Sequence, residues 1–172
     1  MAERAEAAAP AAPPAPTVPE LMDRWEAAWS GRDAGAFAGL CVAAVQYEDP
    51  LADEPLIGAD AIAAHARRLW SAFPDARVER AGERLHDGRF VAAPVRLTAT
   101  HRRALGDVPA TNRSVTVHGV FYCETEHGLL RRVRAFYDVY DAAAQLGILP
   151  ARGSFGARAL LALRGFGLRS RD

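Results

Sequence analysis

Lysine is absent from this sequence: all 21 basic residues are arginine, and 21 acidic residues balance them to a net charge of zero. Without a net positive field or a cluster of basic residues, the chain is not expected to bind nucleic acid or an anionic membrane surface. Long apolar runs are missing too, since none approaches the roughly 20 residues that cross a bilayer. The N-terminal residues lack the bulky apolar stretch of a secretion signal, so we expect a cytoplasmic protein.

Cysteine is scarce, with only Cys41 and Cys123 in the chain. Neither belongs to a C-x-x-C motif or to a Cys/His spacing of the kind that a zinc site needs. A disulfide framework is not expected in a domain with this much apolar core. We therefore predict two buried thiols and no metal site.

The chain does contain enough apolar residues for one folded domain, since half of its 172 residues are hydrophobic. Residues 1–16 are rich in Ala and Pro and are predicted to form a disordered tail. We assign residues 17–150 to the folded domain and residues 151–172 to a C-terminal extension. Within that extension, residues 157–163 are predicted to form a short helix.

Three helices are predicted in the first half of the domain. The segment Thr17-Val18-Pro19-Glu20 has the form of a capping box, and the helical spacing of apolar residues after it continues to Gly31. Asp33 is placed to cap a short second helix. A third amphipathic helix is predicted over residues 59–73, where Pro74 stops it.

Five further segments have the pattern of β-strands: residues 42–47, 77–85, 90–101, 113–124 and 130–140. Turn signals separate the last four, which predicts a meander of bent antiparallel strands. The expected fold class is therefore α+β, with three N-terminal helices packed on a strongly curved, mainly antiparallel sheet. Both faces of residues 115–123 are largely apolar, and the helices can cover only one of them. We therefore expect a second copy to cover the other, as a homodimer.

One carboxylate lies where the first predicted strand ends, in the sequence Glu48-Asp49-Pro50. A carboxylate that faces an apolar pocket can act as a proton-transfer base, and Asp49 is the first candidate for catalysis. Tyr47 shares its face of the strand, and His65 lies on the apolar face of the third helix, so both are candidate partners. The alternatives are a loop cap for Asp49 and core roles for Tyr47 and His65. A raised pKa of Asp49 would favour the base, and an ordinary or lowered pKa the cap.

Other side chains are candidates for binding a ligand. Trp25 and Trp29 would serve as both core and pocket wall, because aromatic rings hold flat apolar molecules. Arg96 and His118 lie on strands whose inward face the pattern does not fix, and an inward Arg96 could bind a carboxylate or an enolate oxygen. His101 is either buried at the edge of the same strand or solvated in the following turn.

The order of elements and several motifs resemble the nuclear transport factor 2-like superfamily. Three branches are matched by these residues: Glu48-Asp49-Pro50, Glu54-Pro55, Gly58 and Ala61-Ile62 for ketosteroid isomerase; Tyr47-x-Asp49 for limonene epoxide hydrolase; Phe73-Pro74-Asp75, Thr98-x-Thr100-His101, Pro109-Ala110-Thr111-x-Arg113, the Asp138 region and Gln145-Leu146-Gly147-x-Leu149-Pro150 for SnoaL-like polyketide cyclases. The resemblance covers most of residues 18–150. It implies a cone-shaped domain, with Asp49 in the place of the isomerase base.

The chain departs from these families at their other catalytic positions. Ala135 stands where SnoaL-like cyclases have an acid/base aspartate, and Phe121 stands at or near the position of their histidine. The oxyanion-hole tyrosine of the isomerase falls at Trp25, and its protonated aspartic acid near Gly119 or Val120. Steroid isomerisation is therefore not expected, because an enolate would lack these donors. Tyr137 shares a face with Ala135, so its hydroxyl is the nearest replacement donor.

The resemblance implies an enzyme without cofactor or metal that acts on a polyketide or terpenoid intermediate of bacterial secondary metabolism. Acid–base catalysis by Asp49, with Tyr47 and His65, would drive ring closure, double-bond isomerisation or epoxide opening. Trp25, Trp29, Phe73, Phe121 and Tyr137 would hold the substrate. The alternative is a non-catalytic small-molecule binding or dimerisation module of the same fold.

Overall fold

The computed structural model describes residues 16–156 and 158 of the chain. The predicted tail over residues 1–16 and the predicted helix over residues 157–163 lie outside the described residues, apart from positions 16 and 158. Within the described part, no helix is both long and apolar enough to cross a membrane.

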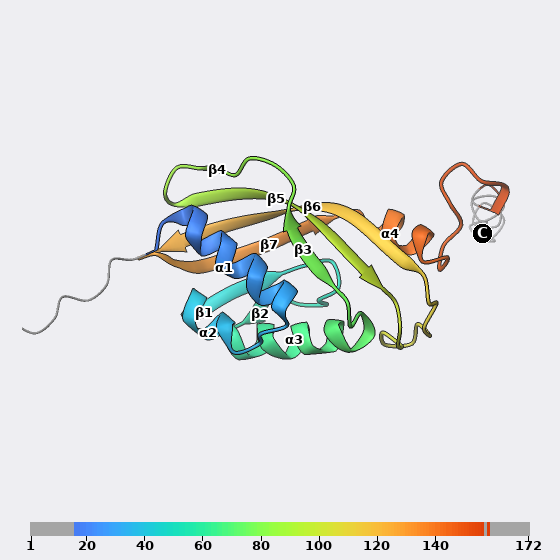
Figure 1. Ribbon diagram of the computed structural model, residues 1–172, viewed down its shortest axis with the longest axis horizontal. Helices are drawn as coiled ribbons and strands as arrows, with labels where there is room; N and C mark the ends of the chain where they lie inside the picture. Colours follow the sequence, from blue (N-terminus) through green and yellow to red (C-terminus); the bar gives the residue numbers. More distant parts are fainter. Residues whose placement is uncertain (1–15, 157, 159–172) are drawn as a thin grey trace, which may run out of the picture.

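The fold is α+β, as predicted, with helices packed on the inner side of a curved sheet (Figure 1). The helices and strands, in chain order, are α1 (Val18–Gly31), α2 (Ala36–Leu40), β1 (Cys41–Glu48), β2 (Leu56–Ile57), α3 (Ala59–Ala72), β3 (Arg77–Arg80), β4 (Leu85–His86), β5 (Phe90–Thr100), β6 (Ser114–Glu126), β7 (Leu129–Tyr137) and α4 (Val139–Gln145). The strand order is β2-β1-β7-β6-β5-β3, and β4 also pairs with β5. All pairings are antiparallel except β1 with β7, which brings the end of β1 beside the last strand.

Local sequence explains where the helices begin. Thr17 accepts a hydrogen bond from the amide of Glu20, whose side chain accepts in turn from the amide of Thr17 at 2.8 Å, so the predicted capping box is present. The residue that precedes α2 is Gly35 and not the predicted cap Asp33, but Asp33 accepts from the amides of Gly35 and Ala36 at 3.1 and 3.2 Å in the turn that leads into the helix.

Two predicted strands are corrected. The segment 77–85 forms two short strands, β3 and β4, which pair with different parts of β5. The segment 130–140 leaves the sheet after Tyr137, because Asp138 accepts a hydrogen bond from the amide of Asp141 at 2.9 Å and caps α4. Repeating apolar residues at 139, 142 and 143 therefore belong to a helix, where alternation alone predicts a strand.

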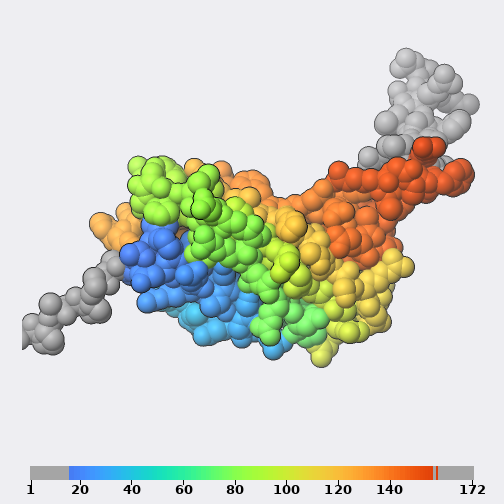
Figure 2. Space-filling model, turned by 45° about the horizontal axis from the view of Figure 1, so that its top comes forward, coloured from blue at the N-terminus to red at the C-terminus, as the bar shows by residue number. Residues whose placement is uncertain are grey.

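Helix α4 and the residues after it lie against the start of β6, although Thr116 and Gln145 are 29 residues apart in the sequence. The side chain of Gln145 accepts from the amide of Thr116 at 2.9 Å and donates to its carbonyl at 2.8 Å. Gly147 has a positive φ of 74°, and a Cβ atom there would overlap the guanidinium of Arg113. Figure 2 shows this contact region at one end of the molecule, where the orange segment meets the yellow one.

The two faces of the sheet differ in composition. The inner face carries buried side chains such as Val95 and Phe121, which join the helices in one core. Cys41 and Cys123 are buried free thiols in that core, as predicted, and burial raises the pKa of Cys41 to about 12. The outer face leaves Phe136 exposed, at 55% of its surface.

Candidate active site

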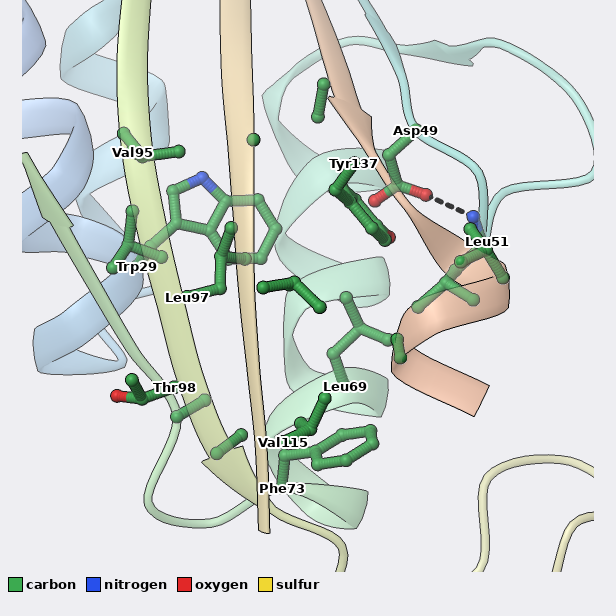
Figure 3. Close-up of a pocket in the computed structure, with 18 of the residues that line it drawn as sticks. Trp29, Asp49, Leu51, Leu69, Phe73, Val95, Leu97, Thr98, Val115 and Tyr137 are labelled. Carbon is green, nitrogen blue, oxygen red and sulfur yellow. Dashed lines mark hydrogen bonds between the residues drawn. The ribbon is translucent and has the colours of Figure 1, made fainter. Parts of the chain in front are cut away.

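A cavity of about 270 Å³ lies between the inner face of the sheet, α3 and α4. Its walls are mainly apolar, and Asp49 and Tyr137 lie together at one end (Figure 3). Apolar walls with a few converging polar groups are typical of sites for small molecules. The lining includes Trp29, Leu69, Phe73, Val95, Leu97, Val115, Phe121, Ala135, Val139 and Leu146.

Asp49 lies just beyond the end of β1, and its side chain is only 2% exposed. Its carboxylate accepts three hydrogen bonds: from the amide of Leu51 at 2.7 Å, from the hydroxyl of Tyr47 at 2.9 Å, and from Nε2 of His65 at 2.8 Å. Two of these donors are within two residues of Asp49, and the third comes from α3. The three donors favour the ionised carboxylate and fix its orientation at the cavity wall.

The side chain of Arg68 determines which ring nitrogen of His65 carries the hydrogen. Arg68 donates from Nη2 to Nδ1 of His65 at 3.1 Å, and the same Nη2 lies 2.8 Å from the carbonyl of Leu51. Because a guanidinium only donates, Nδ1 must be the acceptor, and the hydrogen of the neutral ring is on Nε2, facing Asp49. His65 itself does not line the cavity, so it acts on a ligand only through Asp49.

Opposing effects act on the pKa of Asp49. Burial raises it, but the hydrogen bond and the electrostatic attraction of His65, together with the hydrogen bonds from Leu51 and Tyr47, lower it more, so the pKa lies below the usual range of an aspartic acid. A lowered pKa is the value expected of a loop cap, and the Leu51 contact is such a cap. The same carboxylate nevertheless faces the cavity, so the cap and the site role coincide in one side chain.

The two tyrosines at this end have different surroundings. Burial, followed by the neighbouring Asp49 charge, raises the pKa of both Tyr47 and Tyr137, so both are neutral donors at physiological pH. Tyr47 already donates to Asp49. For the hydroxyl of Tyr137 no hydrogen bond is found within residues 16–156, and it lines the cavity beside Ala135. Tyr137 can therefore donate to a ligand.

Four of the five predicted ligand-binding aromatics line the cavity: Trp29, Phe73, Phe121 and Tyr137. Trp25 does not, because it is fully buried behind Trp29, Tyr47 and Phe121, with ring centroids 5.9 to 6.1 Å apart across this cluster. Its assignment to the pocket wall is corrected to a core role.

Arg96 and His118 are also corrected. They pair across β5 and β6 on the outer face, because the buried neighbours Val95 and Val117 take the inner positions. Arg96 forms a surface ion pair with Glu79 at 2.6 Å. Neither side chain lines the cavity.

Sequence reasoning missed Arg68 and did not decide the place of His101. Arg68 follows His65 by three residues, a spacing that places two helical side chains side by side, so this signal was present. His101 is buried, at 1% exposure, and lines the cavity. Across the described positions, no three His, Cys, Asp or Glu side chains form a group that could hold a metal ion.

Comparison with known proteins supports the fold. A hypothetical protein with a ketosteroid isomerase-like fold from Catenulispora acidiphila is 20% identical, with a TM-score of 0.66 over 76% of this chain and 95% of that one. TsrD from Streptomyces laurentii is 20% identical, with a TM-score of 0.68 over 77% of this chain and 96% of that one. IdmH from Streptomyces antibioticus, a proposed polyketide cyclase, is 18% identical, with a TM-score of 0.66 over 75% and 97%.

At these identities the solved structures establish the fold and not the activity, and they agree with the expected nuclear transport factor 2-like architecture. No curated protein matches the sequence. The family profile of SnoaL-like polyketide cyclases matches residues 20–146. This match spans α1 to α4 and includes both Asp49 and Tyr137, so the chain is a member of the SnoaL-like polyketide cyclase family.

Proposed function

We propose that the protein is a cytoplasmic, cofactor-independent enzyme that uses acid–base catalysis on a polyketide-like intermediate of bacterial secondary metabolism. The observation that carries this proposal is the Asp49 carboxylate, buried and oriented by three donors, at the wall of an apolar cavity beside the hydroxyl of Tyr137, which has no hydrogen-bond partner among the described residues. Family membership and the resemblance to IdmH support the substrate class.

In the proposed reaction, Asp49 removes a proton from carbon or oxygen of the substrate and returns it to the product. Tyr137 donates a hydrogen bond to the substrate oxygen on which negative charge develops. His65 and Arg68 are positioning residues, because they contact the carboxylate and its partner but not the cavity. Ring closure, double-bond isomerisation and epoxide opening can all begin with such a transfer.

The lowered pKa of Asp49 restricts the substrates that this mechanism suits. A weak base removes protons efficiently only from acidic positions, because the rate of proton transfer depends on the match between the two pKa values. A carbon atom between a carbonyl group and a second carbonyl or an aromatic ring is such a position, and unreduced polyketide chains contain one at every second carbon. A simple hydrocarbon terpenoid has none, so we propose a polyketide.

The test is deuterium exchange at the acidic benzylic carbon of 2-tetralone in D₂O, followed by proton NMR. Wild-type protein is expected to accelerate exchange, and Asp49→Asn should reduce the catalysed rate by about 10²- to 10⁴-fold. Tyr137→Phe should reduce it less, because one hydrogen bond is lost. The outer-face variant His118→Ala is the control and should behave as wild type. Exchange that is equally fast in wild type and Asp49→Asn would contradict the proposal.

A second candidate function is non-catalytic binding of the same class of ligand. Two observations favour it: Ala135 replaces the expected acid, and the pKa of Asp49 is lowered rather than raised. A pure binding module would take up 2-tetralone without any exchange above the buffer rate, and Asp49→Asn would not change that result.

We also propose a homodimer formed through the outer face of the sheet. Tyr122 is 43% exposed there and stacks on Phe90, with ring centroids 6.2 Å apart, and Phe136 is exposed nearby. Apolar side chains gathered on one sheet face are typical of an interface. Light scattering should give twice the monomer mass for wild type, and Tyr122→Glu should shift the protein toward the monomer. A wild-type monomer at all concentrations would contradict this proposal.

A further inference from the structure

The imidazole of His101 forms part of the cavity wall just beyond the end of β5. The residue is only 1% exposed, and its Nε2 atom has no hydrogen-bond partner within the described part of the chain. A buried polar atom without a partner is costly, so such atoms in native proteins are normally paired. Because Nε2 belongs to a cavity-lining side chain, a bound molecule can provide the missing partner.

The hydrogen-bond role of this atom follows from the other ring nitrogen. Nδ1 of His101 lies 3.3 Å from the hydroxyl oxygen of Thr111 and accepts from the amide of the same residue, also at 3.3 Å. Because a backbone amide only donates, Nδ1 must be the acceptor, and the neutral ring carries its hydrogen on Nε2. The unpartnered atom is therefore a donor, and its partner must be an acceptor such as a carbonyl or carboxylate oxygen.

The ring is held in place before any ligand binds. It stacks on Phe73, which also lines the cavity, with ring centroids 5.0 Å apart and an interplanar angle of 26°. The backbone of His101 is fixed in both directions, since its amide donates to Arg113 at 3.0 Å and its carbonyl accepts from Asn112 at 2.9 Å. A donor with a fixed orientation binds its acceptor with little further loss of conformational entropy.

His101 lies far along the cavity from the candidate catalytic pair. Tyr137 pairs with Gly119, which pairs with Val95, and His101 follows Val95 by six residues, which corresponds to about 20 Å of extended strand. In Figure 3, Phe73 marks the His101 end, and Asp49 and Tyr137 lie at the opposite end. The walls between them are mainly apolar, with Leu97 and Val115 among their residues.

We propose that His101 is a ligand-binding residue that donates a hydrogen bond from Nε2 to an oxygen at the end of the ligand remote from Asp49. The ligand is accordingly elongated and largely apolar, with a carbonyl or carboxylate oxygen at one end and the reacting group at the other. This inference extends the proposed function, because it identifies which part of the substrate the cavity recognises, and it requires only that the cavity binds a ligand.

The experiment compares 9-fluorenone with fluorene, two flat molecules that differ by one carbonyl oxygen. Wild-type protein is expected to bind fluorenone roughly three- to tenfold more tightly, the effect of one neutral hydrogen bond. His101→Phe keeps a ring that can stack on Phe73 but has no donor, and should bring the two affinities to within a factor of about two. In wild type labelled with ¹⁵N-histidine, the Nε2 signal of His101 should shift with fluorenone and not with fluorene.

Three variants test whether the preference for fluorenone arises at His101 and not at another part of the protein. His118→Ala removes an exposed histidine and should leave the preference unchanged. Tyr137→Phe removes the donor at the Asp49 end and so separates the two ends of the cavity: a preference that persists places the carbonyl at His101, and a preference that is lost places it at Tyr137. Asp49→Asn should lose deuterium exchange but keep the preference, so the two proposals can fail independently.

Several outcomes would overturn the role of His101. They are equal affinity of wild type for both probes, binding of neither probe, an unchanged preference in His101→Phe, and loss of the preference in Tyr137→Phe. If His101→Phe does not fold, the Nε2 signal in wild type decides: no shift with fluorenone contradicts the proposal.

Discussion

The two ends of the cavity hold polar groups in opposite states. At one end the Asp49 carboxylate accepts from three donors of the chain itself, whereas at the other end Nε2 of His101 has no partner in the described residues. The Asp49 carboxylate has its hydrogen bonds without a ligand, whereas in our proposal Nε2 of His101 gains its partner only when a ligand binds. This difference separates a group that is oriented for chemistry from a group that is suited to recognition.

The two ends are also built from different kinds of contact. Asp49 takes two of its donors from its own loop and strand, and only His65 comes from elsewhere in the chain. His101 depends on contacts across the fold, with Phe73 on the α3 side and Thr111 in the loop before β6. The Asp49 end is therefore stabilised largely by local structure, and the His101 end by tertiary packing.

The largest loss of stability is expected when the carboxylate of Asp49 is removed. Asp49→Ala would leave the hydroxyl of Tyr47 and Nε2 of His65 buried without an acceptor, so the free energy of unfolding should fall by about 3 kcal/mol or more. Asp49→Asn keeps an acceptor oxygen and should cost less. Urea denaturation measures both variants. A loss below about 1 kcal/mol in Asp49→Ala would show that these hydrogen bonds contribute little.

A smaller loss of stability is expected from a substitution of Gly119 on β6, which pairs with Tyr137 on β7. A Cβ atom on Gly119 would lie 2.7 Å from the carbonyl oxygen of Phe136 and 3.3 Å from Cβ of Tyr137. Gly119→Ala should therefore displace β7 and lower the free energy of unfolding by about 1–3 kcal/mol. It should also reduce exchange activity, because Tyr137 moves. Gly39→Ala is the matched control, since nothing lies within 4 Å of its added Cβ, and it should be neutral or stabilising.

The free energy of unfolding is expected to depend on pH through Asp49. Because the folded-state pKa of Asp49 is lowered, its contribution to stability is present above the unfolded-state pKa of about 3.9 and is lost as the pH falls through the folded-state value. Wild type should lose more stability than Asp49→Asn below about pH 4. Urea midpoints between about pH 2.5 and 7 measure this. Parallel curves for the two proteins would mean that the pKa of Asp49 is unchanged by folding.

The smallest effect is expected on the outer face of the sheet. Arg96 and Glu79 are each about half exposed, and ion pairs in such surroundings contribute little. Arg96→Ala should change the free energy of unfolding by no more than about 0.5 kcal/mol and should leave fluorenone affinity unchanged. Weaker binding of fluorenone would show that Arg96 reaches the cavity after all.

Much of the site was predictable from neighbouring residues. Strand alternation placed Tyr47 and Asp49 on one face, and the helical pattern placed His65 on the buried face of α3, where the structure joins all three. Tyr137 and Ala135 share the cavity face, as their spacing indicated. In each case the deciding relation is the geometry of a single strand or helix.

Other features could not be predicted from the sequence of a single helix or strand. The orientation of Arg96 and His118 was undetermined, because the face of a long strand depends on its register with its neighbours and on which side the helices cover. The sign of the pKa shift of Asp49 was also undetermined. It depends on the balance between burial, which raises the pKa, and hydrogen-bond donors from two parts of the fold, which lower it. The end of β7 at Tyr137 was undetermined as well, because the residues that follow can continue the strand or form a helix. The cap that Asp138 provides for α4 favours the helix.

The sequence by itself determined the class of fold, the positions of the three N-terminal helices, and the place of Asp49 beside Tyr47 at a strand end. Periodicity, capping and alternation are local properties, so they are present in the order of residues. Only the tertiary structure decided that His65 and Arg68 complete the Asp49 end, that Trp25 is core, and that His101 lines the cavity while its Nε2 atom is unpaired among the described residues. These depend on the packing of α3 against the sheet and on strand register, which no single segment specifies.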